Sequence, residues 1–199
     1  MRTYEWSVWN QDEQKFSCKS VQRPTLSGEF PDSEGGNKCG RLTRAEEEAL
    51  PDDDPRVVLS QSVNCNQVIY GVLDAPDATA ADGTPTPLEN VPFMAYFKRS
   101  GFRPVRDFID QQLTRRKILM QKAVIELSTE KKKNGSVIFW TPKLSLVKEV
   151  SITDADKDLI KMFGETVKGH NESVMTDYKA AVQMSMNDED LHLAQRCAS

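Results

Sequence analysis

The residues best suited to binding chemistry lie in the middle of the chain, where cationic and aromatic side chains alternate. Residues 93–150 contain 13 Lys and Arg against 5 Asp and Glu, together with 7 of the 15 aromatic residues. Residues 1–92 carry a net charge of −8 and residues 151–199 a net charge of −4. Lysine and arginine neutralise phosphates, and aromatic rings stack on unpaired bases. The pattern favours a surface for a flexible polyanion; the alternative is a solvated surface over an ordinary aromatic core.

Three parts of this basic segment supply the candidate binding residues. A strand that ends near Phe97 enters a glycine-containing loop, and three lysines occupy the tip of an expected hairpin. Phe139 and Trp140 are adjacent on one expected strand, so their side chains point to opposite faces and one of them must leave the core. For Trp140, the alternative is packing beneath the C-terminal helix. The candidate nucleic-acid-binding residues are Tyr96, Lys98, Arg99, Phe102, Arg103, Lys131, Lys132, Lys133, Trp140 and Lys143.

Residue patterns for catalysis are not evident in the sequence. It contains no Ser/His/Asp set, no Cys/His pair and no glycine-rich phosphate loop. His170 follows Gly169 near an expected helix end, and we expect its side chain to face solvent. The sequence therefore predicts a non-catalytic protein without a cofactor.

The four cysteines are Cys18, Cys39, Cys65 and Cys197, and none of them forms a C-x-x-C pair. Reduced, mostly structural thiols are expected in a cytoplasmic chain. A zinc site formed by the first three cysteines and a histidine remains an alternative, although the prediction is no metal. No apolar run is long enough for a transmembrane helix, and the N-terminus lacks the apolar segment of a signal peptide. We therefore expect a cytoplasmic protein that does not bind membranes.

Hydrophobic periodicity indicates the elements that must position these residues. Residues 104–117 carry apolar positions at helical spacing, and Asn134-Gly135 between two alternating runs predicts a tight hairpin turn. The segments 22–55 and 74–88 are expected to be long loops, the first with a short helix at 43–50. The expected strands are 4–9, 56–63, 67–73, 91–99, 118–128 and 136–150.

After the last strand, we expect one helix beginning near Thr153 and a second at about 171–184. Residues 1–184 are expected to form a single OB-like domain, and residues 185–199 a flexible acidic tail. The fold class is α+β, with a curved antiparallel sheet or OB-like β-barrel, an inserted helix and C-terminal helices. An open sheet with helices on one face is the alternative.

Two blocks, NVPFMAYFKRSGFRPVRDFI and STEKKKNGSVIFWTPKLSLV, resemble small bacteriophage proteins of the single-stranded-DNA-binding kind. The resemblance covers mainly residues 89–150, with weaker support from DPRVVLSQSVNCNQVIYG. It implies binding of single-stranded DNA with little sequence preference, in support of phage DNA replication or recombination in the host cytoplasm. Replication or recombination proteins are implied as further partners.

One departure from that resemblance concerns the C-terminus. The acidic run Asn187-Asp188-Glu189-Asp190-Leu191 is followed by Leu193-Ala194-Gln195-Arg196-Cys197, so a partner-recruiting acidic tail is not implied. The alternative function is a phage structural or host-interaction protein that binds other proteins. Homo-oligomerisation is left open by the sequence.

Overall fold

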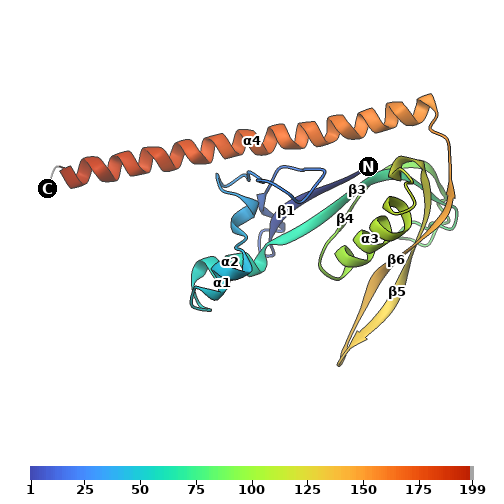
Figure 1. The fold of residues 1–199 in the computed structure, drawn as a ribbon, viewed down its shortest axis with the longest axis horizontal. Helices are drawn as coiled ribbons and strands as arrows, with labels where there is room; N and C mark the ends of the chain where they lie inside the picture. Colours follow the sequence, from blue (N-terminus) through green and yellow to red (C-terminus); the bar gives the residue numbers. More distant parts are fainter. Residues whose placement is uncertain (198–199) are drawn as a thin grey trace. The chain divides into compact units, whose positions relative to one another are not determined.

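The computed structural model describes residues 1–197 and the side chains up to Met186, and its fold is α+β (Figure 1). A curled antiparallel half-barrel sheet of four strands, consistent with an OB-like fold, is accompanied by a second sheet and a C-terminal helix. The strands are β1 (Arg2–Asn10), β2 (Lys15–Lys19), β3 (Asn64–Ala75), β4 (Leu88–Phe97), β5 (Ala123–Asn134) and β6 (Val137–Glu149). The α-helices are α1 (Arg44–Glu48), α2 (Pro55–Ser62), α3 (Phe102–Phe108) and α4 (Asp154–Cys197). Short helical turns are η1 (Lys38–Gly40), η2 (Arg99–Gly101), η3 (Ile109–Thr114) and η4 (Met120–Lys122).

The chain divides into two compact units, each described by itself below. Unit 1 comprises residues 1–2 and 67–164, and unit 2 comprises residues 3–66 together with α4 from Glu165 on. The four-stranded sheet has the order β2-β1-β3-β4, and the second sheet contains only β5 and β6. Within the described part of the chain, no helix has the length and apolar character needed to span a membrane.

The core of unit 1 forms around α3 and η3, whose apolar residues recur at helical spacing. Val105, Phe108, Ile109 and Leu113 are buried together. The helix packs on both sheets because each sheet turns one apolar face toward it. Its half-buried neighbours are Ile69, Phe97, Ile118, Met120, Ala123, Ile125, Leu144 and Leu146.

The β5–β6 hairpin confirms the turn predicted at Asn134-Gly135. Asn134 pairs with Val137, and Gly135 adopts φ +59°, a conformation that glycine reaches without steric cost. The two strands form a ribbon that runs well beyond α3 (Figure 1). Only the base of this ribbon is therefore covered by the helix.

In unit 2, β1 and β2 pair antiparallel beside a buried cluster of Val8, Cys18, Cys39 and Val63. The half-buried Trp6 packs on this cluster and meets the Phe30 ring edge-on at 6.5 Å between centroids. Helix α1 lies in the expected position and begins with a capping box between Thr43 and Glu46.

The strand predicted at 56–63 is wrong, because this segment forms α2. Asp54 caps the helix by accepting a hydrogen bond from the Arg56 amide at 2.8 Å, and Pro55 occupies the first turn. A good N-cap followed by proline starts a helix even where the next residues are β-branched. Strand β2 was not predicted.

The C-terminal segment also differs from prediction, since α4 is one continuous helix where two helices and a tail were expected. Gly164 and Gly169 lie within it, and each faces open space, so no packing contact forces a break there. The predicted tail, 185–199, continues the helix as far as Cys197, and its last two residues lie outside the described part of the chain.

Candidate functional site

The register of the β5–β6 hairpin decides which candidate residues share a face. Lys131 pairs directly with Trp140, and Lys133 pairs with Ile138. Side chains of directly paired residues, and of residues two apart on a strand, lie on the same face. Lys131, Lys133 and Trp140 therefore share one face near the tip of the hairpin.

This face is the outward continuation of the one that packs on α3. Leu144 contacts the α3 core, and Pro142 and Trp140 follow on the same face at intervals of two residues toward the tip. The hairpin extends past the helix, so Trp140 has nothing above it and is 61% exposed. The alternative that Trp140 packs beneath the C-terminal helix is therefore wrong.

The η2 turn brings further cations to this face. An ideal Cβ on Gly101 would lie 3.6 Å from Cδ of Pro142, so the turn that carries Arg99 rests against β6. Lys98 and Arg99 are exposed, and Phe102 is half-buried at the start of α3. We call the surface formed by Arg99, Lys131, Lys133 and Trp140 the arm face.

Other candidate residues lie elsewhere in unit 1. Tyr96 pairs with the buried Val68, on the face of β4 opposite to Phe97 and hence opposite to α3. Tyr96 therefore does not join the arm face.

The remaining cations are also separated from Trp140 or already paired. Lys132 lies on the other face of the hairpin with its amine 2.8 Å from Glu130, and this hydrogen bond lowers the pKa of the Glu130 carboxyl. Lys143, opposite Ser128, shares that other face. Arg103 forms an ion pair with Asp107 at 3.4 Å. The structure thus reduces ten candidate residues to a smaller connected group.

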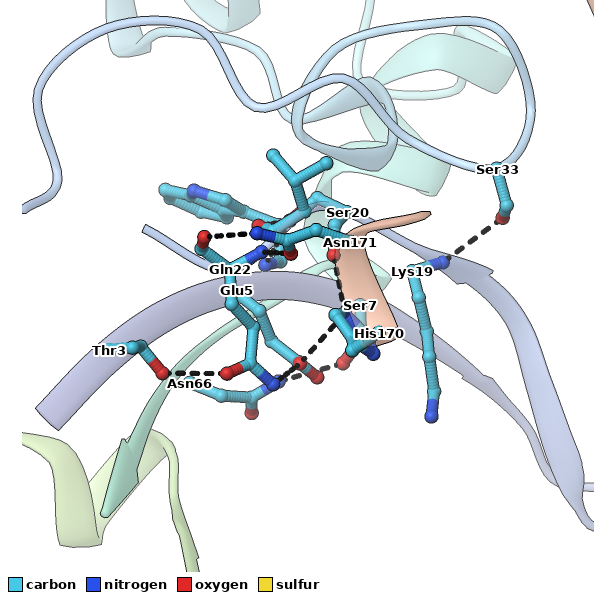
Figure 2. Close-up of polar contacts among 12 residues, drawn as sticks. Thr3, Glu5, Ser7, Lys19, Ser20, Gln22, Ser33, Asn66, His170 and Asn171 are labelled. Atoms are coloured by element: carbon cyan, nitrogen blue, oxygen red, sulfur yellow. Dashed lines mark hydrogen bonds and ion pairs between the residues drawn. The ribbon is translucent and has the colours of Figure 1, made fainter. Parts of the chain in front are cut away.

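Unit 2 contains a buried polar network that the sequence did not reveal (Figure 2). Glu5 is fully buried on β1, and its Oε2 accepts a hydrogen bond from Gln22 Nε2 at 2.9 Å. Thr3 Oγ1 donates to the Gln22 side-chain oxygen at 2.7 Å. Burial raises the pKa of Glu5, and the nearby His170 and the Gln22 hydrogen bond oppose that rise.

Two residues of α4 connect to this network. His170 Nε2 lies 3.0 Å from the Ser20 carbonyl oxygen and 3.6 Å from Glu5 Oε2. Asn171 accepts a hydrogen bond from the Gln22 amide at 2.6 Å and donates one to the Gln22 carbonyl at 3.1 Å. Because these bonds satisfy main-chain groups that no strand covers, they fasten α4 within unit 2.

The prediction that His170 faces solvent is wrong. The buried Val174 lies four residues further along α4, one helical turn from His170, on the face that packs in unit 2. That spacing in the sequence could have indicated a packed histidine. The signal was weak because glycine at 169 and asparagine at 171 suggested a helix end.

A shallow cavity of about 360 Å³ opens beside His170. It is lined by Phe16, Lys19, Ser33, His170, Ser173, Val174 and Asp177. The Lys19 amine lies 4.2 Å from the centre of the Phe16 ring, so part of the lining is already engaged in a cation–π contact. Its charges are of both signs, which distinguishes it from the cationic arm face.

The cysteines differ from the prediction of reduced thiols, since Cys18 and Cys39 form a disulfide. Their sulfur atoms and a carboxylate oxygen of Asp32 lie within 4.8 Å of one another. Among the described residues this is the one group of side chains able to hold a metal ion, and it includes neither Cys65 nor a histidine. Cys65 is half-buried on β3, where burial raises the pKa of its thiol to about 12.

Two regions thus carry most of the chain's functional-group chemistry, the arm face of unit 1 and the polar network of unit 2. Comparison of the chain with protein-family models, curated proteins and solved structures finds no match. The arm face offers an aromatic ring and cations to a partner, whereas the network spends its polar groups on one another.

Proposed function

We propose that this protein is a non-catalytic single-stranded-DNA-binding protein that holds DNA on the arm face by phosphate contacts and base stacking. The observation that carries the proposal is the 61% exposure of Trp140 directly opposite Lys131 on the projecting hairpin. A tryptophan that neither packs in a core nor lies beneath a helix leaves a large apolar surface in water. A stacked base would cover that surface, and the adjacent ammonium groups would neutralise its phosphates.

Single-stranded DNA suits the arm face better than duplex. Stacking on Trp140 requires a base whose flat face is free, which a paired and stacked duplex does not offer. Phosphates and the faces of bases are common to every sequence, so this mode of binding gives little sequence preference.

The proposed setting follows from the resemblance of residues 89–150. In that setting the protein supports phage DNA replication or recombination in the host cytoplasm, and replication or recombination proteins are further partners. The cations of the arm face serve this role because they bind any single-stranded intermediate regardless of sequence.

A second candidate function is a phage structural or host-interaction protein. The observation in its favour is the apolar surface around the hairpin tip, where Val137 and Ile138 are both more than half exposed. The two-stranded ribbon also has no further strand pairing with its outer edges in the described chain. Such a ribbon could pack on another protein.

Binding of a labelled oligo-dT and of a duplex of equal length, measured by fluorescence anisotropy across a salt series, separates these functions. We expect oligo-dT to bind more tightly than duplex, with affinity falling steeply as salt rises because counterions are released from phosphates. Equal or tighter duplex binding would contradict the stacking mode. Failure to bind oligo-dT at low salt, with self-association that depends on salt, would favour the interaction protein.

A further inference from the structure

The Cys18–Cys39 disulfide lies beside a buried carboxylate that has no cationic partner. Asp32 is 1% exposed, and none of the ion pairs among the described residues includes it. Its Oδ1 accepts hydrogen bonds from the Glu34 and Gly36 amides, and its Oδ2 accepts one from the Cys39 amide at 2.7 Å. A buried charge is ordinarily paired or coordinated to a metal.

The backbone around Cys39 is held in an unfavourable conformation. Lys38 and Cys39 both have φ of +54°, in the left-handed region that non-glycine residues seldom adopt. Consecutive left-handed residues persist only where their surroundings hold them in place. The link from Cys39 to Cys18 of β2 is one such restraint, and the hydrogen bond to Asp32 is another.

In the reducing cytoplasm that the proposed function assigns to the protein, a disulfide is not a lasting restraint. A dithiol reductant would attack one sulfur, form a mixed disulfide and then close its own disulfide. Two electrons and two protons pass to Cys18 and Cys39, which become thiols. Either thiol, once ionised, would place a second negative charge beside Asp32, which a dication would neutralise.

We infer that in the reduced chain Cys18, Cys39 and Asp32 bind one Zn²⁺ ion. Both thiol protons are released, the two thiolates and one Asp32 oxygen coordinate the ion, and a non-protein ligand completes the tetrahedron. Thiolates favour zinc over magnesium or calcium, which prefer oxygen ligands. The ion would replace the disulfide as the link between η1 and β2. The inference rests on the cytoplasmic location in the proposed function.

The consequence of this link reaches α4 through the segment between Phe30 and Gly40. An ideal Cβ on Gly35 would lie 3.2 Å from Cβ of Ala181, so this loop packs directly on the helix in unit 2. Ser33 of the same loop lines the cavity beside His170. Either the disulfide or the zinc ion would keep this loop in place.

Cobalt titration of the full chain, reduced with a phosphine under argon, tests the inference. We expect one Co²⁺ per chain, with the visible bands of a tetrahedral site and a near-ultraviolet sulfur-to-cobalt band, all removed by one equivalent of Zn²⁺. Cys18→Ser should abolish the bands, and the matched control Cys65→Ser should retain them. Asp32→Asn should weaken cobalt affinity by at least about tenfold.

Alkylation of the native reduced chain guards against variants that fail to fold. Zn²⁺ should protect Cys18 and Cys39 from iodoacetamide but not change the labelling of Cys65. Absence of the cobalt bands, their disappearance in Cys65→Ser, or equal affinity in Asp32→Asn would overturn the inference. Oligo-dT binding is measured on the same preparation, so a failure of metal binding is distinguishable from a failure of the proposed function.

Discussion

The arm face of unit 1 and the polar network of unit 2 use similar residue types for different ends. In the network, the Glu5 carboxylate is fully buried and its Oε2 accepts from Gln22. On the arm face, Trp140 and its neighbouring lysines are exposed on a ribbon that outruns its supporting helix. The difference shows that titratable residues in this chain mark structure where they are buried, while an exposed aromatic ring beside cations marks a surface open to a partner.

The largest expected effect comes from removing the central carboxylate of the network. Glu5→Ala should lower the free energy of unfolding by about 3 kcal/mol, because Gln22 and His170 lose their acceptor where water does not replace it. Urea denaturation measures this change. Glu5→Gln is the matched control and should cost much less, since its amide oxygen still accepts from Gln22. Equal destabilisation of the two variants would show that charge, rather than hydrogen bonding, holds the network.

The next effect sharpens the contrast from the side of the arm face. Trp140→Ala should weaken oligo-dT binding by about 1–3 kcal/mol, the value of one stacked base. Its melting temperature should change little because the ring is exposed. Anisotropy titration and thermal unfolding together provide the measurement.

Two aromatic residues serve as controls for that variant. Trp9 of unit 2 is 37% exposed but lies edge-on to Phe16 with 4.9 Å between ring centroids, and Tyr96 lies on the sheet face away from α3. Trp9→Ala and Tyr96→Ala should both retain oligo-dT affinity. If Tyr96→Ala binds as weakly as Trp140→Ala, the DNA path includes the other face of the sheet.

A smaller effect distinguishes the two faces of the hairpin. The double variant Lys131→Ala/Lys133→Ala should flatten the dependence of log affinity on log salt by about 0.7 for each phosphate that these lysines no longer neutralise. The matched double variant Lys132→Ala/Lys143→Ala removes the same charge from the opposite face and should flatten it less. Identical slopes for both variants would mean that only net charge matters.

The smallest expected effect is the pH dependence of the network. Burial raises the pKa of Glu5 against the opposing influence of His170, Gln22 and Lys19. The folded state therefore holds the proton more tightly than the unfolded chain. Its stabilising contribution is complete below the ordinary glutamate pKa and is lost as pH rises through the raised value. We expect native protein to lose stability relative to Glu5→Gln over that range in denaturation at stepped pH; parallel curves would contradict it.

Local patterns were sufficient to predict the elements on which the arm face is built. The apolar spacing after Pro104 predicted the helix that packs on the hairpin, and Asn134-Gly135 predicted its turn, because both signals depend on neighbouring residues alone. The α+β class followed from the same local patterns. The exposed position of one aromatic in the Phe139–Trp140 pair was implied by strand alternation, but which of the two is exposed was not.

Tertiary structure decided the rest, because each remaining question concerns residues far apart in the chain. The pairing register placed Lys131 beside Trp140 and Lys143 behind it, and a shift of one residue would have exchanged the faces. His170 meets Ser20 across 150 positions, and Cys18 meets Cys39 across 21, distances over which no sequence periodicity carries information. The sequence by itself determined the composition of the basic hairpin and its turn. Only packing decided which side chains stay exposed and which become buried partners, since burial depends on what the rest of the fold brings against them.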